Sequence, residues 1–495
     1  MPAPVRRTPR RLTLLASAAL LAASVTSLAA QSSVQPSTDT RPAASAPQAS
    51  GAAANRTNQP ASNGTATVDR PPLPSMMPPV MGPDPSILAL IPASARADAG
   101  KGFDAEAATR AYLATIPASK KAQSDAYFEG GYWITLWDFV LSAAVLVLLL
   151  NHGWSRAMRD RAERVARRPS LRTFVYFAQY VTAYSLILFP FTAYTDWWRE
   201  RRYGLATQTF GPWLGDEVKT FGLTLVFGGL AVMGLYGVVR RLPRSWPVWG
   251  ALVTMAFVVV SMLFGPVYIL PLFNKVTRLQ DARVRDPIIS MARASGIPAR
   301  DVFVVDASRQ TTRVSANVSG IFGTMRITLN DNLLHRGTLP EIEAVMGHEM
   351  GHYVLNHVYE MLVELLVIVV AGFALLKAAF ERARRCWGER WGIRGLDDPA
   401  GLPLAALIVS AYLFALTPVL NTIVRTNEQE ADTFGLNASR QPDGFALVTL
   451  KLADYRKLEP SPLEEWMFYD HPSGRTRILG AMRWKAEHPN GPFGP

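Results

Sequence analysis

The sequence predicts a mainly α-helical, multi-pass membrane protein with a small α+β unit inserted between two of its membrane helices. Hydrophobic residues make up 49% of the 495 residues, and long apolar blocks alternate with polar stretches. Six of these blocks approach the roughly 20 residues that a helix needs to cross a bilayer. The longest interval between blocks, 272–359, contains short β-branched runs as well as helical periodicity.

The N-terminus has the pattern of an export signal. Four arginines between positions 6 and 11 precede an apolar run at 12–28, and two alanines follow it. We expect residues 1–30 to be a signal peptide or a signal anchor, so that the following chain begins outside the cytoplasm. Residues 31–85 are rich in Pro, Ala, Ser and Thr with almost no large apolar side chain, which predicts a disordered tether.

A short amphipathic helical segment is predicted before the first apolar block, in 86–131. Its clearest part is 103–116, where apolar residues have helical spacing and Asp104 and Glu106 lie in the first turn. The six apolar blocks predict membrane helices near 132–151, 173–195, 218–240, 247–271, 360–380 and 402–424.

Arginine-rich loops predict how these helices are oriented. The loops after the first, third and fifth blocks are rich in arginine, and such loops remain in the cytoplasm. The opposite loop, 196–217, is an exception, because Arg199, Arg201 and Arg202 are only partly offset by Asp196 and Glu200. The loops and the export signal agree, and both place 272–359 and the chain after 424 on the outer, periplasm-like side.

Charge and cysteine content exclude several kinds of site. The formal net charge is +12, but the arginines crowd against apolar blocks, so lipid and topology explain them better than nucleic acid does. We therefore expect membrane lipid and no nucleic acid as a partner. A single cysteine, Cys386, excludes an internal disulfide and a zinc site built from cysteines. Any metal must be held by histidines and carboxylates.

The interval 272–359 predicts a small α+β unit. Val302 to Val305 is a β-branched and aromatic run, and 313–319 with 325–329 predicts a hairpin. Thr338 and Glu341 form a capping box that opens a helix. Residues 313–320 (RVSANVSG) would then form a strand beside this helix, whose edge can bind an extended peptide. An ordinary hairpin explains the same residues equally well.

The predicted helix carries HEMGH at 348–352. Side chains four apart share one face of a helix, so His348 and His352 can hold one Zn²⁺ while Glu349 reaches a water beside it. The chain has only seven histidines, so this pattern is not expected to occur by chance. The alternative is a helix with incidental polar residues. We expect one zinc ion per chain and hydrolysis of peptide bonds, with Glu349 as the base.

A third ligand must come from elsewhere, because catalytic zinc usually has three protein ligands. Glu428, in RTNEQEAD, is the best candidate, since this segment follows the sixth block as the motif helix precedes the fifth. Glu430 and Asp432 compete for the role by chemistry alone, and Asp432 also suits a partner that orients a ligand imidazole. The alternative is that these acids form a solvated helix end.

Other polar residues are candidates for supporting roles. His471, in YDHPSGRTRI, is the leading donor to a developing oxyanion, although a histidine before a proline is more often an ordinary turn residue. Arg477 either pairs with an acid near the zinc or lies on the surface. His357 is off the ligand face of the helix, so we expect it to support a ligand or to line the cavity.

The sequence resembles the type I CAAX prenyl protease family and, more distantly, the bacterial heat-shock membrane protease HtpX. The resemblance covers about 132–485 and is carried by YILPLFNKVTRL (268–279), DAS (306–308), GHEMGHYVLNH (347–357), RTNEQEAD (425–432) and HPSGRTRI (471–478). It implies a helical membrane barrel around a water-filled chamber, closed by a zincin-type catalytic domain. It also implies that Glu428 rather than Glu430 is the third ligand, that Asp432 supports the ligands, and that His471 and Arg477 belong to the active site.

The chain departs from this family in three respects. Eukaryotic members have Asn-Ala-Tyr on the edge strand, where this chain has Ser315, Ala316 and Asn317, which puts side-chain preference in doubt. An export signal and tether replace the family's first membrane helix. Eukaryotic members also face the zinc site to the cytosol, whereas the arginine loops here predict the reverse.

These expectations divide the chain into the export signal (1–30), the tether (31–85), the helical segment (86–131), a four-helix membrane domain (132–271), a zinc metallopeptidase domain that includes two membrane helices (272–485), and a tail (486–495). We expect a zinc metalloendopeptidase of a bacterial inner membrane, with a periplasmic catalytic face, acting on exported or membrane proteins and peptides. One alternative is C-terminal processing of prenylated proteins with a cytoplasmic active site. The other is an inactive membrane transporter or scaffold, against which the intact Glu349 argues.

Overall fold

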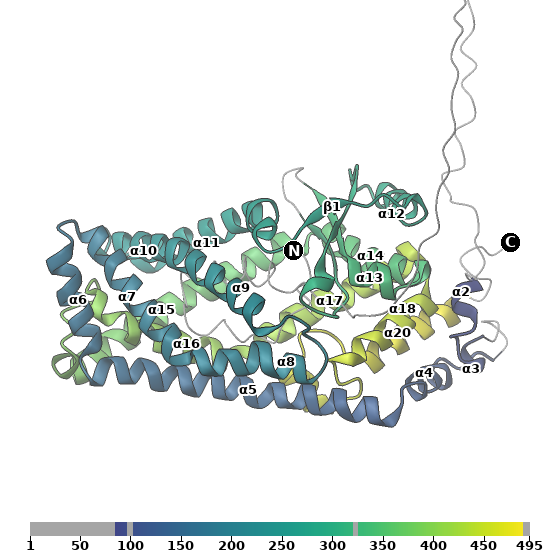
Figure 1. Ribbon diagram of the computed structural model, residues 1–495, viewed down its shortest axis with the longest axis horizontal. Coiled ribbons are helices and arrows are strands. Elements are labelled where there is room, and N and C mark those ends of the chain that lie inside the picture. The colour runs from purple at the N-terminus through teal and green to yellow at the C-terminus, as the bar shows by residue number, and fades with distance from the viewer. Residues whose placement is uncertain (1–84, 97–101, 320–324, 489–495) are drawn as a thin grey trace, which may run out of the picture.

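The computed structural model describes residues 85–96, 102–319 and 325–488. The described chain is an elongated, mainly helical molecule with a small sheet near one end (Figure 1). The predicted export signal and the tether up to residue 84 lie outside the described residues.

Three short helices precede the first long helix: α2 (Pro85–Leu88), α3 (Ala93–Arg96) and α4 (Ala105–Ala114). The helix predicted at 103–116 is confirmed as α4, and the Asp104 carboxylate caps it by accepting from the backbone N–H groups of Glu106 and Ala107. Tyr112 of α4 is fully buried, and its hydroxyl donates to Asp443, 2.7 Å away. The segment before the first long helix is thus fixed to the C-terminal part of the chain.

Five helical stretches are long and apolar enough to cross a membrane. They are α5 (Ala118–Asn151), α7 to α8 (Pro169–Arg202), α9 to α10 (Phe210–Arg241), α11 with its continuation (Trp246–Leu272) and α15 (His357–Trp391). The first five predicted blocks are therefore confirmed as helices. α5 begins well before its apolar block, because its first turns contact the C-terminal half: the Ser124 hydroxyl donates to the Arg456 carbonyl at 2.9 Å.

The sixth predicted membrane helix, 402–424, is present as a bent pair of helices that together are long and apolar enough to cross a membrane. The structure has α16 (Leu402–Ala415) and α17 (Thr417–Ser439), which meet at a bend of 53°. Pro418 explains the break, since it has no N–H to donate to the Phe414 carbonyl and its ring prevents the preceding helix from continuing. α17 is consequently tilted by 53° from α16, and it extends past the end of the apolar block to Ser439.

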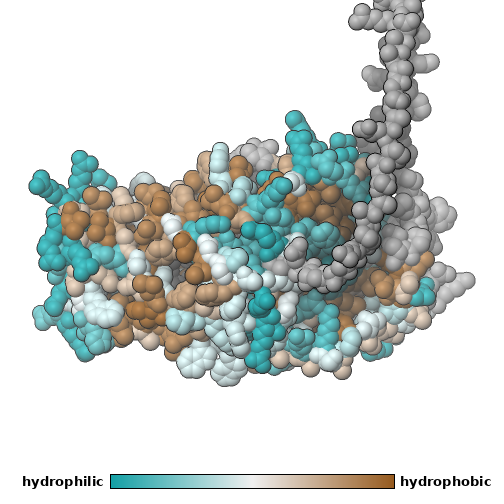
Figure 2. Space-filling model, in the orientation of Figure 1, coloured by the Kyte–Doolittle hydropathy of each residue, from teal (hydrophilic) through white to brown (hydrophobic). Residues whose placement is uncertain are grey.

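The two ends of the molecule differ in character. α6 (Trp154–Val165) lies at one end of the helical bundle, and its Arg156, Arg161 and Arg164 are exposed. In Figure 2 hydrophilic residues gather at this end, and hydrophobic residues cover much of the bundle beside them. The opposite end contains the sheet together with α4, α14 (Leu339–Val354), α18 (Pro442–Lys451) and α20 (Gly474–Glu487) (Figure 1).

The sheet has four strands in the order β1-β2-β4-β3. These are β1 (Val276–Arg278), β2 (Val302–Val305), β3 (Ala316–Ser319) and β4 (Arg326–Asn330). The predicted strand at 302–305 is confirmed as β2, and the predicted hairpin as the antiparallel pair β3 and β4, with Ala316 opposite Leu329. β3 is an edge strand. It starts at Ala316, so Ser315 precedes it and bonds through its carbonyl to the Asn330 N–H at 2.9 Å.

Three helices lie beside the sheet. α12 (Ala282–Ala294) and α13 (Asp331–Arg336) pack near it, and α14 (Leu339–Val354) follows. The predicted capping box is confirmed, with the Thr338 N–H donating to Glu341 Oε2 at 2.7 Å. After α14 the helix is interrupted at Asn356, whose φ of 62° is in the left-handed region, and α15 begins at His357.

A buried charge pair joins the sheet to the helical bundle. Arg313, just before β3, donates to Glu200 of α8, whose carboxylate also accepts from the Tyr127 hydroxyl at 2.5 Å. Arg199 packs its guanidinium over the Tyr127 ring, 4.0 Å from the centroid. Arg199 and Glu200 are both buried, so part of the charge between residues 196 and 217 is internal and neutralised.

α14 and α17 lie in direct backbone contact. A Cβ added to Gly347 of α14 would lie 2.8 Å from the Gly435 carbonyl oxygen of α17, and one added to Gly351 would lie 3.1 Å from Ala431 Cα. One added to Gly435 would lie 2.7 Å from the His348 nitrogen. Small residues spaced four apart on both helices therefore allow an approach that larger side chains would prevent.

We predict that Gly435→Ala destabilises the protein, because its new Cβ meets backbone atoms that can yield only if the helices separate. Overpacking of this kind costs about 1–3 kcal/mol. Gly480→Ala on the exposed side of α20 is the matched control, since nothing lies within 4 Å of its added Cβ, and it should be neutral or stabilising. Thermal unfolding in detergent measures both variants. Equal unfolding temperatures for Gly435→Ala and the wild type would contradict the close approach.

Candidate active site

Two histidines and one glutamate converge where α14 and α17 touch. His348 and His352 lie one turn apart on α14, with their Nε2 atoms 3.2 Å from each other. Glu428 of α17 places Oε2 3.2 Å from His348 Nε2 and Oε1 3.6 Å from His352 Nε2. All three side chains are buried. Their ligand atoms lie within 4.8 Å of one another, the kind of cluster that can hold a metal ion.

The chemistry of this cluster fits a divalent cation such as zinc. Two imidazole nitrogens and a carboxylate are among the common ligand sets of catalytic zinc, and they leave a position open for water. Glu428 Oε2 is buried and accepts no hydrogen bond of good geometry, although two imidazoles lie beside it. An unsatisfied buried carboxylate oxygen is costly, and a cation between the three side chains would compensate it.

A second layer of residues orients the first histidine. His348 Nδ1 lies 2.7 Å from Asp432 Oδ1, on α17 one turn after Glu428. Asp432 in turn accepts two hydrogen bonds from the Arg477 guanidinium, one of them 2.8 Å from Nε to Oδ2. Arg477 also lies over the Phe445 ring. The pairing that the sequence suggested for Arg477 is thus present, and its partner is Asp432.

Burial and charge set the protonation of the histidines in the metal-free protein. Burial lowers the pKa of His352 to about 3, so this imidazole is neutral and has a free lone pair. Burial also acts to lower the pKa of His348, but the adjacent carboxylates of Asp432 and Glu428 outweigh it and raise the pKa to about 10. A cation at His348 Nε2 must displace this proton, so affinity for the cation should rise with pH.

Glu349 lies beside the cluster and has an unusual pKa. It is the residue after His348, it is buried, and its Oε2 has no hydrogen-bond partner. Burial raises the pKa of its carboxyl to about 8, and the Glu428 charge adds to this effect while His348 opposes it. A carboxyl that titrates near neutral pH is suited to accept and return a proton during a reaction.

His471 completes the polar part of the site. It lies between α19 (Pro462–Phe468) and α20, with Nε2 3.1 Å from Glu428 Oε2 and Nδ1 2.8 Å from Asp470 Oδ1. Its segment is held on both sides: the Ser473 N–H donates to Glu465 at 2.7 Å, and Arg425 donates to the Tyr469 carbonyl at 2.6 Å. His471 is therefore a fixed member of the site and not a surface turn residue.

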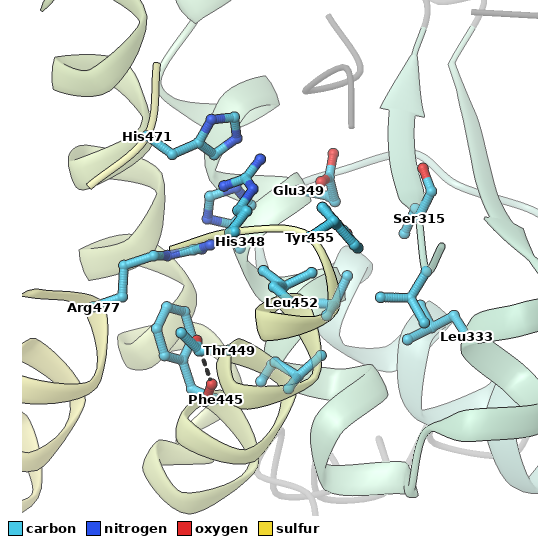
Figure 3. A pocket seen from close by; sticks show the side chains of 16 residues that line it. Ser315, Leu333, His348, Glu349, Phe445, Thr449, Leu452, Tyr455, His471 and Arg477 are labelled. Carbon is cyan, nitrogen blue, oxygen red and sulfur yellow. Dashed lines mark hydrogen bonds between the residues drawn. The ribbon is translucent and has the colours of Figure 1, made fainter. Parts of the chain in front are cut away.

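A pocket joins these polar groups to the edge of the sheet. In Figure 3, His471 and Arg477 lie on one side, Ser315 and Leu333 on the other, and His348 and Glu349 between them. Ser315 and Ala316 line the pocket, whereas Asn317, also predicted for substrate contact, is not among its lining residues. Most of the remaining lining is apolar, including Leu333, Val345, Phe445, Val448 and Leu452.

Sequence reasoning missed the residues that α18 and the turn after it bring to this pocket. Phe445, Val448 and Thr449 come from α18, and Tyr455 follows it. These residues carry no local motif, since an apolar helix in a core has the same composition. Their place depends on α18 packing against α14, where a Cβ on Gly444 would lie 2.5 Å from the Pro340 carbonyl oxygen.

Comparisons with known proteins agree with this arrangement. Residues 278–485 match the family model Peptidase family M48, and residues 107–275 match CAAX prenyl protease N-terminal, five membrane helices. The chain is 30% identical over 395 residues to an uncharacterized metalloprotease, YhfN, of Bacillus subtilis, covering 79% of this chain and 91% of that protein. It is 27% identical to CAAX prenyl protease 1 of Saccharomyces cerevisiae, covering 59% of this chain and 68% of that protein.

A solved structure has the same fold. The crystal structure of Ste24p from S. mikatae superposes with a TM-score of 0.62, covering 74% of this chain and 89% of that chain, at 21% identity. The mainly helical membrane fold with a small attached sheet, expected from the sequence, is confirmed by this match and by the membrane-domain match.

We predict that Glu428→Ala removes the bound metal. Without this carboxylate two imidazoles remain, which is fewer than the three protein ligands of a typical catalytic zinc site. Metal content per purified chain, measured by atomic emission after zinc loading and desalting, should fall close to zero. Gln429→Ala, at the adjacent exposed position, is the matched control and should retain the wild-type content. Full retention by Glu428→Ala would refute the third ligand.

Proposed function

This chain belongs to peptidase family M48 and is an integral-membrane metalloprotease, and we propose that it cleaves exported or membrane proteins and peptides with one zinc ion held by His348, His352 and Glu428. The observation that carries this proposal is the convergence of these three side chains beside Glu349, in a pocket bordered by an edge strand. When bound, the zinc ion would supply Lewis acidity toward a carbonyl oxygen and a water.

The residues of the chain have separate tasks in this reaction. Glu349 takes a proton from the attacking water and delivers it to the leaving amine, a task that suits its raised pKa. His471, held by Asp470, presents Nε2 to the same centre and donates a hydrogen bond to the oxyanion that develops on the substrate carbonyl. Asp432 holds the His348 ring, and Arg477 holds Asp432.

The edge strand is proposed to bind the substrate backbone. Within the part of the chain that the structure describes, β3 has a neighbouring strand on one side only, and the pocket lies beside its first residue, Ala316, and the preceding Ser315. An extended peptide can add to such an edge through main-chain hydrogen bonds, which depend little on substrate side chains. The apolar lining of the pocket then favours an apolar side chain near the cleaved bond.

We predict that Glu349→Gln lowers cleavage of a quenched fluorescent peptide by at least about 100-fold, which is the low end of the contribution of a general base. The variant should keep its zinc, because Glu349 is not a ligand. Glu343→Gln, on the same helix and bound to Gln441 at 2.9 Å, is the matched control and should cleave as the wild type does. Equal activity of Glu349→Gln and wild type would refute the mechanism.

The proposed location is a bacterial inner membrane with the site facing the periplasm. The packing of α4 supports it: Tyr112 bonds to Asp443, and Glu106 bonds to Arg475 at 2.8 Å, so the segment before α5 and the peptidase domain lie on the same side. An export signal at 1–30 would place that side outside. The exposed arginines of α6 lie at the opposite end of the molecule, where the cytoplasm would be.

This orientation predicts the behaviour of reporters fused after Pro495. An alkaline phosphatase fusion, which needs the oxidising periplasm, should be active, and a green fluorescent protein fusion should be dark. A fusion within the loop after α10, next to Arg241, should give the reverse pattern and serves as the internal control. A fluorescent C-terminal fusion would overturn the orientation and favour the alternative, processing of prenylated proteins with a cytoplasmic active site; the yeast relative is named a CAAX prenyl protease.

A further inference from the structure

We propose that His357 and Glu430 form a hydrogen-bonded chain that fixes the His352 ring as a metal ligand, so that both are positioning residues of the site. The inference deepens the proposed function and rests on the metal site formed by His348, His352 and Glu428. It assigns a task to two residues that the mechanism above does not use.

The geometry of the chain is explicit. His352 Nδ1 lies 2.9 Å from His357 Nδ1, and the two rings meet edge to face, with an interplanar angle of 69°. His357 Nε2 lies 3.2 Å from Glu430 Oε2. His357 is 2% exposed, while the Glu430 side chain is 54% exposed. The chain thus runs from the buried ligand through a buried histidine to a carboxylate at the surface.

Only one arrangement of hydrogens satisfies this geometry together with a bound metal. A ligand that binds through Nε2 carries its hydrogen on Nδ1, so His352 must donate from Nδ1. His357 Nδ1 is then the acceptor, and its hydrogen is on Nε2, where it donates to Glu430. Each ring therefore has one defined tautomer and orientation, and the His352 Nε2 lone pair points at the other ligands.

The backbone conformation at Asn356 allows His357 to join this hydrogen-bonded chain. On a continuous helix, His357 would lie about 140° around the axis from His352, because each residue turns the helix by about 100°. Asn356 interrupts the helix with a φ of 62°, a left-handed conformation that asparagine tolerates better than most residues. This break in the helix places His357 on the Nδ1 side of His352. Residue 357 of a continuous helix would not reach that side.

The two ligand histidines are supported in matching ways from α17. His348 is supported directly by Asp432, which is buried and paired with Arg477. His352 is supported by Glu430, but through His357. Three acids in one segment of α17 therefore have separate tasks. Glu428 is a ligand, Asp432 orients the His348 imidazole, and Glu430 orients the His352 imidazole through His357.

The test is zinc affinity, measured by competition with a chromogenic chelator on the full-length chain in detergent. His357→Leu removes both hydrogen bonds and should weaken zinc binding by about 10–100-fold, the usual effect of losing such a partner. His357→Asn keeps an acceptor near the Nδ1 position and should recover part of this loss. Glu430→Ala should lose less than His357→Leu, since water can reach this exposed end. Gln429→Ala is the matched control and should bind as the wild type does.

Two further readouts separate positioning from a merely structural role. The visible spectrum of the cobalt-loaded protein should change in His357→Leu and be largely restored in His357→Asn. Peptide cleavage by His357→Leu should return toward the wild-type rate when zinc is saturating, because the variant loses affinity and not the base Glu349. Cleavage that stays low at saturating zinc, with an unchanged zinc dissociation constant, would overturn the inference.

Other outcomes are also decisive. Zinc binding by His357→Leu within twofold of wild type would overturn the inference, as would equal weakening in His357→Leu, His357→Asn and Gln429→Ala. If His357→Leu does not fold, wild-type affinity in both His357→Asn and Glu430→Ala would overturn it. The proposed function fails separately, through a wild-type protein that binds zinc and cleaves no peptide, or through an active Glu349→Gln.

Discussion

The backbones of α14 and α17 touch, and the candidate site exists because they do. Gly347 and Gly351 on one helix face Ala431 and Gly435 on the other, and a single added methyl group would meet main-chain atoms. This distance lets Glu428 reach the ring nitrogens of both histidines on α14 and lets Asp432 reach the back of one of them. A wider spacing would leave the two imidazoles without a third ligand, and a buried carboxylate without a partner.

The same contact determines which buried charges the protein can carry. Asp432 and Glu428 are buried and the Arg477 side chain is 10% exposed, which is tolerated only where partners are close and well oriented. The Arg477 guanidinium meets both oxygens of Asp432, and His471 and His348 flank Glu428. Glu349 has no such partner, and its raised pKa is the physical consequence. The group in the site whose burial is least compensated by partners is thus Glu349, to which the mechanism assigns proton transfer.

Much of this arrangement could be predicted from local sequence. HEMGH implies two ligands on one helical face, the capping box at Thr338 locates the start of that helix, and the β-branched run at 302–305 with the hairpin pattern at 313–329 predicts the strands. Chemistry alone does not select the third ligand among Glu428, Glu430 and Asp432, and the preference for Glu428 over Glu430 comes from the family resemblance. Which of the three acids contacts which histidine depends on the bend before α17 and on the break in the helix at Asn356. Both are tertiary features. The bend within the sixth membrane span was not predicted for a related reason, because hydropathy counts apolar residues and does not register the break that Pro418 imposes.

X-ray absorption at the zinc edge of the zinc-loaded, purified protein tests the central claim most directly, because it reports the ligands themselves. The account predicts one zinc per chain, with a first shell of nitrogen and oxygen only and the multiple-scattering pattern of two imidazoles. In Glu428→Ala that shell should be lost. A first shell with one imidazole or none, or a sulfur ligand from Cys386, would contradict a site built from α14 and α17.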